Sequence, residues 1–255
     1  MQLSWKFIPI LFIFHATITY FTMMWVVEDL ALDKYFEENS FPPSSIEEVK
    51  NLSNLMKEHA VTRYFTCVVF HWAGFYFLQT WCIPGTFMFN LLSGSLFGTL
   101  QAWMFCVVLN TLGGYTCFWI SKHFGQEIVA HDFIRSKTEK LSQLISQHKD
   151  NLFYYLTFLR IFPGSPNWLM NVSFPHLGIK DSYVLLSIFL GLMPWNFIVC
   201  EAGSVLSTIE SKSDVLRPET YIKLLLIAFV FLLPPLLKRL FCAKVGEDLD
   251  KLKQE

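Results

Sequence analysis

The sequence predicts an all-α, multi-pass membrane protein with two inverted-topology repeats, each a Pro-Gly-broken re-entrant helical hairpin followed by a transmembrane helix. The first observation is composition: the 255 residues are 53% hydrophobic and 16% charged, and the 26 Phe lie in runs. The second is a pair of broken apolar stretches, with Pro84-Gly85 in one and Pro163-Gly164 in the other. The third is the likeness of the two stretches, in which matched residues lie 81 positions apart: Phe77 and Phe158, Asn90 and Asn171, and Leu96 and Leu177.

A broken helix inside a membrane restricts where its backbone can lie. Each unpaired backbone N–H or C=O costs several kcal/mol in hydrocarbon, so we expect both breaks to be buried or to line a wet cavity. Paired broken segments in the two halves of a chain are typical of a transport path. The alternative is that both Pro-Gly sites are kinks in ordinary spanning helices, where neighbouring groups re-satisfy the backbone.

The first element is an N-terminal transmembrane helix within residues 1–27. Residues 7–27 are apolar and exceed the roughly 20 residues that cross a bilayer, and Lys6 precedes them. We interpret this helix as an uncleaved signal anchor, because no small-x-small cleavage site follows it. Residues 28–60 are predicted to form an acidic lumenal loop, with eight Asp or Glu against three Lys.

The membrane domain is predicted to cover residues 61–237. In its first repeat, about 64–121, the hairpin covers residues 64–97, since 86–97 is too short to cross at about 1.5 Å per residue. Residues 99–120 then form a spanning helix. The stretch 126–151 places Ile134, Leu141, Leu144, Ile145 and His148 on one face, which predicts a cytosolic amphipathic helix.

The second repeat, about 152–206, follows the same plan. Residues 152–162 and 168–177 form the hairpin, and residues 183–206 form a spanning helix. A last transmembrane helix is expected at 221–237, and the tail 238–255 begins with Lys238 and Arg239. Because basic flanks lie inside, both termini are predicted to be cytosolic and the two hairpins to enter from opposite faces.

Arg160 is the most informative polar residue, because it lies in an apolar run three positions before the second break. A membrane-embedded Arg costs about 2.5–3.5 kcal/mol on insertion scales, so we expect it to face a cavity or a partner. Its planar fork suits the oxygens of a phosphate group. The alternative is that Arg160 only caps nearby carbonyls or pairs with a carboxylate such as Glu201.

Polar residues near both breaks form the candidate pathway for a lipid headgroup. They are Arg160, Asn167, Asn171, Gln79, Asn90 and Glu201. The residues that make the breaks are Pro84, Gly85, Pro163, Gly164 and Pro166.

Several classes of function are disfavoured. The chain has no legible nucleophile–base pair or phosphate-binding Gly loop, so we do not expect an enzyme or a cofactor. The net charge of −1 gives no indication of a nucleic-acid partner. The six Cys lie mostly in apolar stretches without metal-ligand spacing, so we expect small buried thiols, no metal site and no disulfide framework.

The block Phe-Leu-Arg-Ile-Phe-Pro-Gly-Ser-Pro-Asn-Trp at 158–168, with Ile-Pro-Gly-Thr at 83–86 and Ala-Gly-Ser-Val-Leu at 202–206, resembles the VTT-domain (DedA) superfamily. The transmembrane protein 41 family is the nearest group, and the resemblance covers about residues 64–237. It implies an endoplasmic-reticulum protein with two opposed re-entrant loops that acts as an energy-independent phospholipid scramblase in lipid mobilisation and autophagosome formation. Bacterial members resemble proton-coupled carriers, but Thr86 and Asn167 stand where charged residues would be expected, which favours passive exchange.

Two short motifs bear on the compartment. Lys251 and Lys253 resemble a dilysine retrieval signal, which would bring coat proteins as partners beside the membrane phospholipids. An ordinary Lys-rich tail is the alternative. Asn51-Leu52-Ser53 is a possible glycosylation site in the expected lumenal loop.

Three functions remain open from the sequence. They are a scramblase, an ion- or proton-coupled transporter of a phosphorylated lipid or solute, and a non-transporting membrane assembly factor. The oligomeric state is left open.

Overall fold

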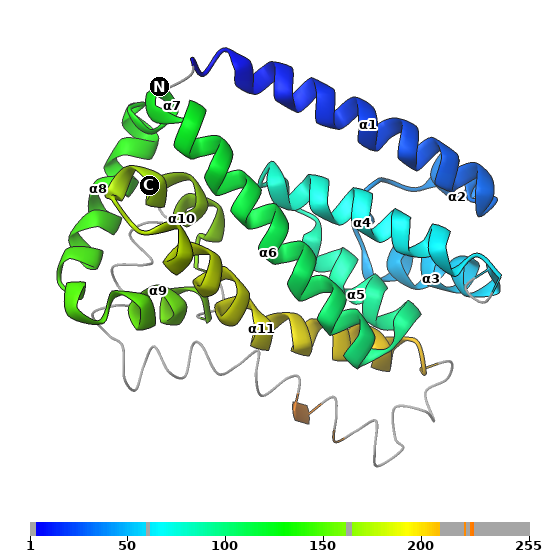
Figure 1. The fold of residues 1–255 in the computed structure, drawn as a ribbon. Coiled ribbons are helices and arrows are strands. Elements are labelled where there is room, and N and C mark those ends of the chain that lie inside the picture. Colours follow the sequence, from blue (N-terminus) through cyan, green and yellow to red (C-terminus); the bar gives the residue numbers. More distant parts are fainter. Residues whose placement is uncertain (1–3, 60–61, 162–164, 210–221, 223–224, 227–255) are drawn as a thin grey trace.

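The computed structural model describes residues 4–59, 62–161, 165–209, 222 and 225–226. Every regular element in this part of the chain is a helix (Figure 1). In chain order the elements are α1 (Phe7–Asp29), α2 (Asp33–Glu38), α3 (Ile46–His59), α4 (Tyr64–Thr80), α5 (Thr86–Phe97), α6 (Thr99–Phe124), α7 (Gln126–Val129), α8 (Asp132–Ser146), η1 (Lys149–Asn151), α9 (Leu152–Ile161), α10 (Asn167–Ser173), η2 (Phe174–Leu177) and α11 (Asp181–Leu206).

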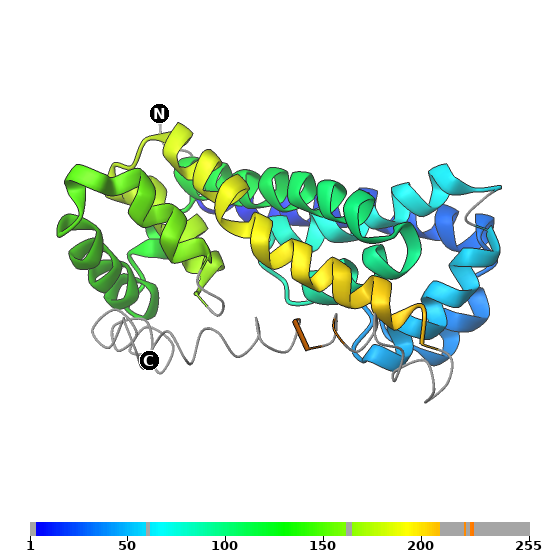
Figure 2. The ribbon, with the colours of Figure 1, turned by 90° about the horizontal axis from the view of Figure 1, so that it is seen from below.

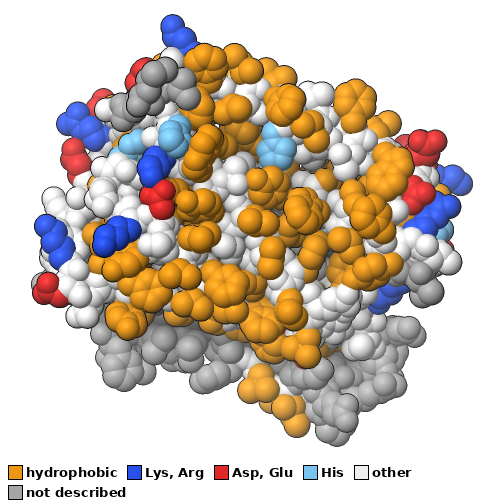
Figure 3. Space-filling view, in the orientation of Figure 1, with side chains coloured by type: hydrophobic (Ala, Val, Ile, Leu, Met, Phe, Trp, Pro, Cys, Tyr) orange, Lys and Arg blue, Asp and Glu red, His pale blue; other side chains and the backbone are white. Residues whose placement is uncertain are grey.

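Three of these helices, α1, α6 and α11, are long and apolar enough to cross a membrane. They coincide with three spans that the sequence predicts, and the fourth, at 221–237, lies almost wholly outside the described residues. Hydrophobic side chains cover the middle of the visible face, and charged side chains gather at its two sides (Figure 3). This distribution is the one expected of a multi-pass membrane protein.

The helices α6 and α11 form an antiparallel pair. Thr99 Oγ1 donates to Glu201 Oε2 at one end, and Lys122 Nζ lies 2.7 Å from Asp181 Oδ2 at the other. We call these the Thr99 end and the Lys122 end of the pair. Near the middle, Asn110 Nδ2 donates to Asn196 Oδ1 at 2.9 Å.

Two broken segments pack against this pair. In the first broken segment α4 ends at Thr80 and α5 begins at Thr86, and in the second α9 ends at Ile161 and α10 begins at Asn167. The interruptions therefore lie where the sequence predicts them. Gly98, with a φ of 75°, joins the first segment to α6. Gly178, with a φ of 70°, lies between the second segment and α11. A positive φ is strained for residues with a Cβ, which explains glycine at both turns.

The two broken segments begin at opposite ends of the α6–α11 pair. The Tyr64 hydroxyl, at the start of α4, accepts a hydrogen bond from Gln101 at the Thr99 end. The Phe153 ring, near the start of α9, lies 5.8 Å from the Tyr183 ring at the Lys122 end. Each segment thus runs from its own end toward the middle (Figures 1 and 2).

Packing interleaves the two halves. The helices α4 and α9 contact the long helix of their own half, whereas α5 packs on α11 and α10 packs on α6. The α5–α11 contact is very close: a Cβ added at Gly94 would lie 1.9 Å from the Cys200 carbonyl oxygen, and one added at Gly203 would lie 2.0 Å from that of Leu91. Glycine at both positions lets the two backbones touch.

The segment predicted as an acidic loop is largely helical. In α3, Val49, Leu52 and Met56 are fully buried at helical spacing, and the helix packs on α5. Ser53 Oγ lies 2.6 Å from Ser95 Oγ of α5. The acidic residues lie on the other face, so charge counting alone gives the wrong local structure. Ser45 Oγ accepts from the Glu48 N–H at 3.1 Å and caps the start of the helix.

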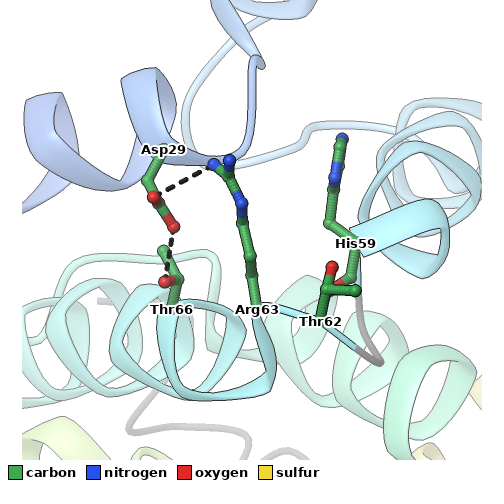
Figure 4. A network of polar contacts seen from close by, with 5 residues as sticks. All are labelled: Asp29, His59, Thr62, Arg63 and Thr66. Carbon is green, nitrogen blue, oxygen red and sulfur yellow. Dashed lines mark hydrogen bonds and ion pairs between the residues drawn. The ribbon is translucent and has the colours of Figure 1, made fainter.

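A polar network fastens the end of α1 to the start of α4 (Figure 4). Asp29 Oδ1 lies 3.0 Å from Arg63 Nη1, and Asp29 Oδ2 accepts from Thr66 Oγ1 at 2.7 Å. Both charged side chains are partly exposed, so the network positions the helix ends more than it stabilises them.

The amphipathic stretch 126–151 is not one helix. It divides into α7, α8 and η1, with an interruption at Ala130-His131. Leu141, Leu144 and Ile145 are buried as predicted. Lys137 is buried as well, with its Nζ 4.6 Å from the Phe133 ring centroid. Its position follows from spacing, because 137 lies four residues before 141 on the same side of the helix.

Candidate functional site

Arg160 lies at about half the depth of the α6–α11 pair. Its Cβ is the nearest atom to a Cβ built at Gly191, at 2.5 Å. Gly191 is the eleventh of the 26 residues of α11, so it lies about 15 Å from the start of that helix at about 1.5 Å per residue. The Arg160 side chain is only 2% exposed.

Among the described residues, every hydrogen-bond partner of the guanidinium is neutral. Arg160 Nε donates to Ser187 Oγ at 3.0 Å, Nη1 donates to Asn167 Oδ1 at 3.3 Å, and Nη2 donates to Asn171 Oδ1 at 3.0 Å. The group also lies 5.4 Å from the Phe174 ring centroid. The sequence analysis placed Arg160, Asn167 and Asn171 in one site, and the structure brings them together.

No described carboxylate forms an ion pair with Arg160. The alternative in which Arg160 pairs with Glu201 is wrong for this structure, because Glu201 binds Thr99 at the far end of the helix pair. Antiparallel packing of α6 and α11 sets this separation. Within the part of the chain that the structure describes, the positive charge therefore lies near mid-depth and is hydrogen-bonded only to neutral groups.

A second polar cluster lies nearby on three helices. Asn196 Oδ1 of α11 accepts from Asn90 Nδ2 of α5 at 3.1 Å and from Asn110 Nδ2 of α6 at 2.9 Å. Asn90 was a predicted pathway residue, whereas Asn110 and Asn196 were not. An Asn in an apolar run could have marked each of them as a candidate site residue. That they contact each other depends on tertiary packing, which the sequence does not show.

Buried polar atoms without a partner in the described part of the chain gather at this level. Thr80 Oγ1 adjoins the first break and Ser165 Oγ the second, and Asn90 Oδ1, Ser93 Oγ and Asn196 Nδ2 lie on the neighbouring helices. Each such group costs about 1–3 kcal/mol when it is left unpaired. One such atom beside each break, Thr80 Oγ1 and Ser165 Oγ, fits a site that takes polar molecules.

Both broken segments touch one turn of α6. A Cβ at Gly113 would lie 2.7 Å from Gln79 Cβ of α4, and a Cβ at Gly114 would lie 3.3 Å from Asn171 Nδ2 of α10. The predicted pathway residues Gln79 and Asn171 therefore contact α6 at two consecutive glycines.

The remaining predicted residues are more dispersed. Pro84 is exposed. Gly85 has a φ of 135°, and a Cβ built on it would lie 2.6 Å from the Pro42 ring. Pro166 comes directly before the first residue of α10. Asn51 is exposed on α3, although Ser53 of the same sequon is buried against Ser95. Pro163, Gly164, Lys251 and Lys253 lie outside the described residues.

Ser187 accepts directly from Arg160, although no sequence pattern predicts it as a site residue. Ser187 lies in the apolar run of α11, 27 residues after Arg160, and nothing local links the two. Within the described residues, no three His, Cys, Asp or Glu side chains are grouped as a metal site.

Comparison with known proteins agrees with this architecture. Residues 83–205 match the family model described as the VTT domain. A transmembrane protein 41 homolog from Dictyostelium discoideum is 30% identical over 197 residues, which cover 77% of this chain and 59% of the relative. Transmembrane protein 41B from Xenopus laevis is 28% identical over 77% of this chain and 70% of the relative. Transmembrane protein 41B from Homo sapiens is 27% identical over 77% of this chain and 67% of the relative.

No solved structure matches the chain. The match to the Dictyostelium protein leaves about two fifths of that relative uncovered. The matched region contains both breaks, the α6–α11 pair and the Arg160 site. By these matches, residues 83–205 are similar to the VTT domain, and the chain is similar to the transmembrane protein 41 group.

Proposed function

We propose that this protein is a phospholipid scramblase of the endoplasmic-reticulum membrane that exchanges lipids between leaflets without an energy source. The headgroup passes the Arg160 site while the acyl chains stay in the bilayer. The observation that carries this proposal is a guanidinium near mid-depth whose hydrogen-bond partners, as far as the chain is described, are all neutral.

The chemistry of that site suits a phosphate group. A guanidinium forms strong, charge-assisted hydrogen bonds with phosphate oxygens, often two at once. Asn167 and Asn171 currently accept two of its donors, and a phosphate would replace these amide oxygens with charged ones. The gain offsets part of the cost of dehydrating the headgroup, which is the main barrier to its crossing.

In this proposal the two broken segments are re-entrant hairpins and form an inverted repeat. Three findings support it: the segments begin at opposite ends of the α6–α11 pair, their four helices are each shorter than α1, α6 and α11, and both segments contact α6 at Gly113-Gly114. Opposed half-spans that meet at mid-depth would give each leaflet access to the same polar site.

Passive exchange is favoured over proton coupling because of the charges near the site. Thr86 follows the first Pro-Gly, Asn167 follows the second, and Glu201 binds Thr99 at one end of the helix pair. A proton-coupled carrier needs a titratable group beside its substrate, and no described carboxylate contacts Arg160. We likewise propose that the protein is not an enzyme.

The cellular setting follows from the family resemblance. We propose cytosolic termini, retrieval through Lys251 and Lys253 by coat proteins, and a role in lipid mobilisation and autophagosome formation. Membrane phospholipids are the direct partners in this proposal.

The test is leaflet exchange of labelled phospholipid by the purified full chain in vesicles, with and without a pH gradient. We expect exchange without a gradient and a loss of about tenfold or more in Arg160→Gln. The matched control is Arg135→Gln, which removes an exposed Arg of α8 that pairs with Glu139.

The outcomes separate the three functions. Exchange that needs the gradient supports a coupled transporter, and no exchange by well-folded wild type supports an assembly factor. Either result overturns the scramblase proposal. Equal exchange by Arg160→Gln and wild type overturns the role of Arg160.

A further inference from the structure

We propose that Cys82 and Cys117 form a redox-reactive dithiol, a modification site that takes a small two-electron oxidant such as hydrogen peroxide. The two sulfurs lie 3.3 Å apart and join the first break to α6. The sequence analysis treated all the cysteines as inert small side chains, and the structure singles out this pair.

Geometry places the two thiols within reach of a disulfide bond. Closing the pair needs the sulfurs to approach from 3.3 Å to about 2.05 Å, a movement that side-chain rotation can supply. Both residues are free thiols. They are 35 positions apart in sequence, so a bond between them would link the break directly to the long helix.

The backbone at Cys82 is a second, independent observation. Cys82 has a φ of 55°, in a region that residues with a Cβ seldom adopt. It occupies the position just after the α4 C-cap, and the next N–H, of Ile83, donates to the Leu78 carbonyl at 2.9 Å. Glycine is the usual residue at this position, so cysteine here is held in strain with its sulfur against Cys117.

A cavity gives an oxidant access to the pair. It has a volume of about 200 Å³, and both cysteines line it together with Thr80 and Ser121. A water molecule needs only about 10–15 Å³ of such volume, so there is room for peroxide, which is slightly larger. Cys106 of α6 and Cys200 of α11 also interact, but both are fully buried.

The oxidation is balanced with one peroxide molecule. One sulfur attacks a peroxide oxygen and the O–O bond breaks, which gives a sulfenic acid and one water. The other sulfur then attacks the sulfenic sulfur; the S–S bond forms, and the sulfenic oxygen leaves as a second water. A dithiol reductant reverses the change by thiol–disulfide exchange.

The consequence for transport rests on the scramblase proposal. A Cys82–Cys117 bond would tie the tip of the first broken segment to α6 and restrict rearrangement around Gly113-Gly114. We therefore expect oxidised protein to exchange lipid severalfold more slowly than reduced protein.

The first experiment tests the site alone. The full chain is treated with hydrogen peroxide, blocked with a maleimide, digested without reductant and mapped by mass spectrometry. We expect a linked Cys82–Cys117 peptide that dithiothreitol removes, present in Cys106→Ser but absent in Cys82→Ser. A fully maleimide-reactive Cys82 after treatment, or equal linkage of Cys106 to Cys200, would overturn the proposal.

The second experiment measures lipid exchange before and after oxidation. Slower exchange in wild type that recovers on reduction, with no change in Cys82→Ser, supports the regulatory role. A disulfide that forms without changing exchange overturns that role only. If the reduced protein exchanges no lipid, the scramblase proposal fails while the peptide map still decides the dithiol.

Discussion

Gly191 of α11 touches the base of the Arg160 side chain: a Cβ at Gly191 would lie 2.5 Å from Arg160 Cβ and 3.1 Å from the Thr157 carbonyl oxygen. We expect Gly191→Ala to push α9 off α11 and to lower stability by about 1–3 kcal/mol, the usual cost of overpacking. Lipid exchange should fall as well, because Arg160 moves away from Ser187. Thermal unfolding and vesicle exchange measure the two effects.

The neighbouring residue supplies the control for this substitution. Leu190 is 40% exposed on the outer side of α11, so Leu190→Ala should leave lipid exchange unchanged. If Gly191→Ala matches wild type in both measurements, neither stability nor lipid exchange depends on the close packing of α9 on α11.

Asn171→Asp tests the uncompensated charge without changing the shape of the side chain. Its carboxylate would lie where Asn171 Oδ1 now accepts from Arg160 Nη2 at 3.0 Å, and would neutralise the guanidinium. We expect stability at least equal to wild type but lipid exchange reduced about tenfold or more, since a paired Arg160 no longer attracts phosphate. The charge-matched control is Asn151→Asp at an exposed position. Undiminished exchange by Asn171→Asp would argue that Arg160 is purely structural.

The glycine contacts between α5 and α11 should be intolerant of any side chain. Gly94→Ala and Gly203→Ala each put a methyl group within about 2 Å of a carbonyl oxygen, and backbone cannot move aside as a side chain can. We expect a loss of about 3 kcal/mol or more, seen as a low yield of folded protein. Gly114→Ala is the comparison, because its Cβ would meet only side-chain atoms at 3.3 Å or beyond. Normal folding of Gly94→Ala would show that the two helices pack less closely.

Glu48 should make the segment between α1 and α4 sensitive to acid. The Ser44 N–H and hydroxyl donate to its carboxylate at 3.0 and 2.7 Å, and together with Ser40 they hold the pKa of Glu48 below its usual 4.5. Because the folded pKa lies below the unfolded one, this stabilisation is complete above pH 4.5 and is lost as the pH falls through the folded value.

Glu48→Gln should therefore be less stable than wild type near neutral pH, and the difference should shrink below about pH 4.5. Thermal unfolding of both proteins across that range measures it. Glu47→Gln, at the exposed neighbouring position, should show no such convergence. A difference that stays constant with pH would mean that the hydrogen bonds do not depend on the charge of Glu48.

The helices of the membrane domain were predictable because strong local signals mark them. α5 matches its predicted bounds residue for residue, since Gly85 and Gly98 stand on either side of an apolar run. The helix α3 was missed because its acidic residues dominate the composition, although Val49, Leu52 and Met56 keep helical spacing. Charge count and periodicity gave conflicting indications there, and periodicity was the better guide.

The candidate site was predictable only where its residues lie close together in the chain. Asn167 and Asn171 follow Arg160 within eleven residues, so a local pattern groups them. Ser187 contacts Arg160, and Asn196 contacts Asn90 and Asn110, because of where α11 lies along the helices that it packs on. No local sequence pattern specifies that position. The same position separates Glu201 from Arg160, and for that reason their pairing could not be judged from sequence.

The two adjacent glycines of α6 have a mechanical consequence. Consecutive helical residues point about 100° apart, so Gln79 and Asn171 press on different sides of a single turn. A sideways shift of that turn alters both contacts at once. The first broken segment therefore cannot rearrange at this point without disturbing the contact that the second broken segment makes with the same turn.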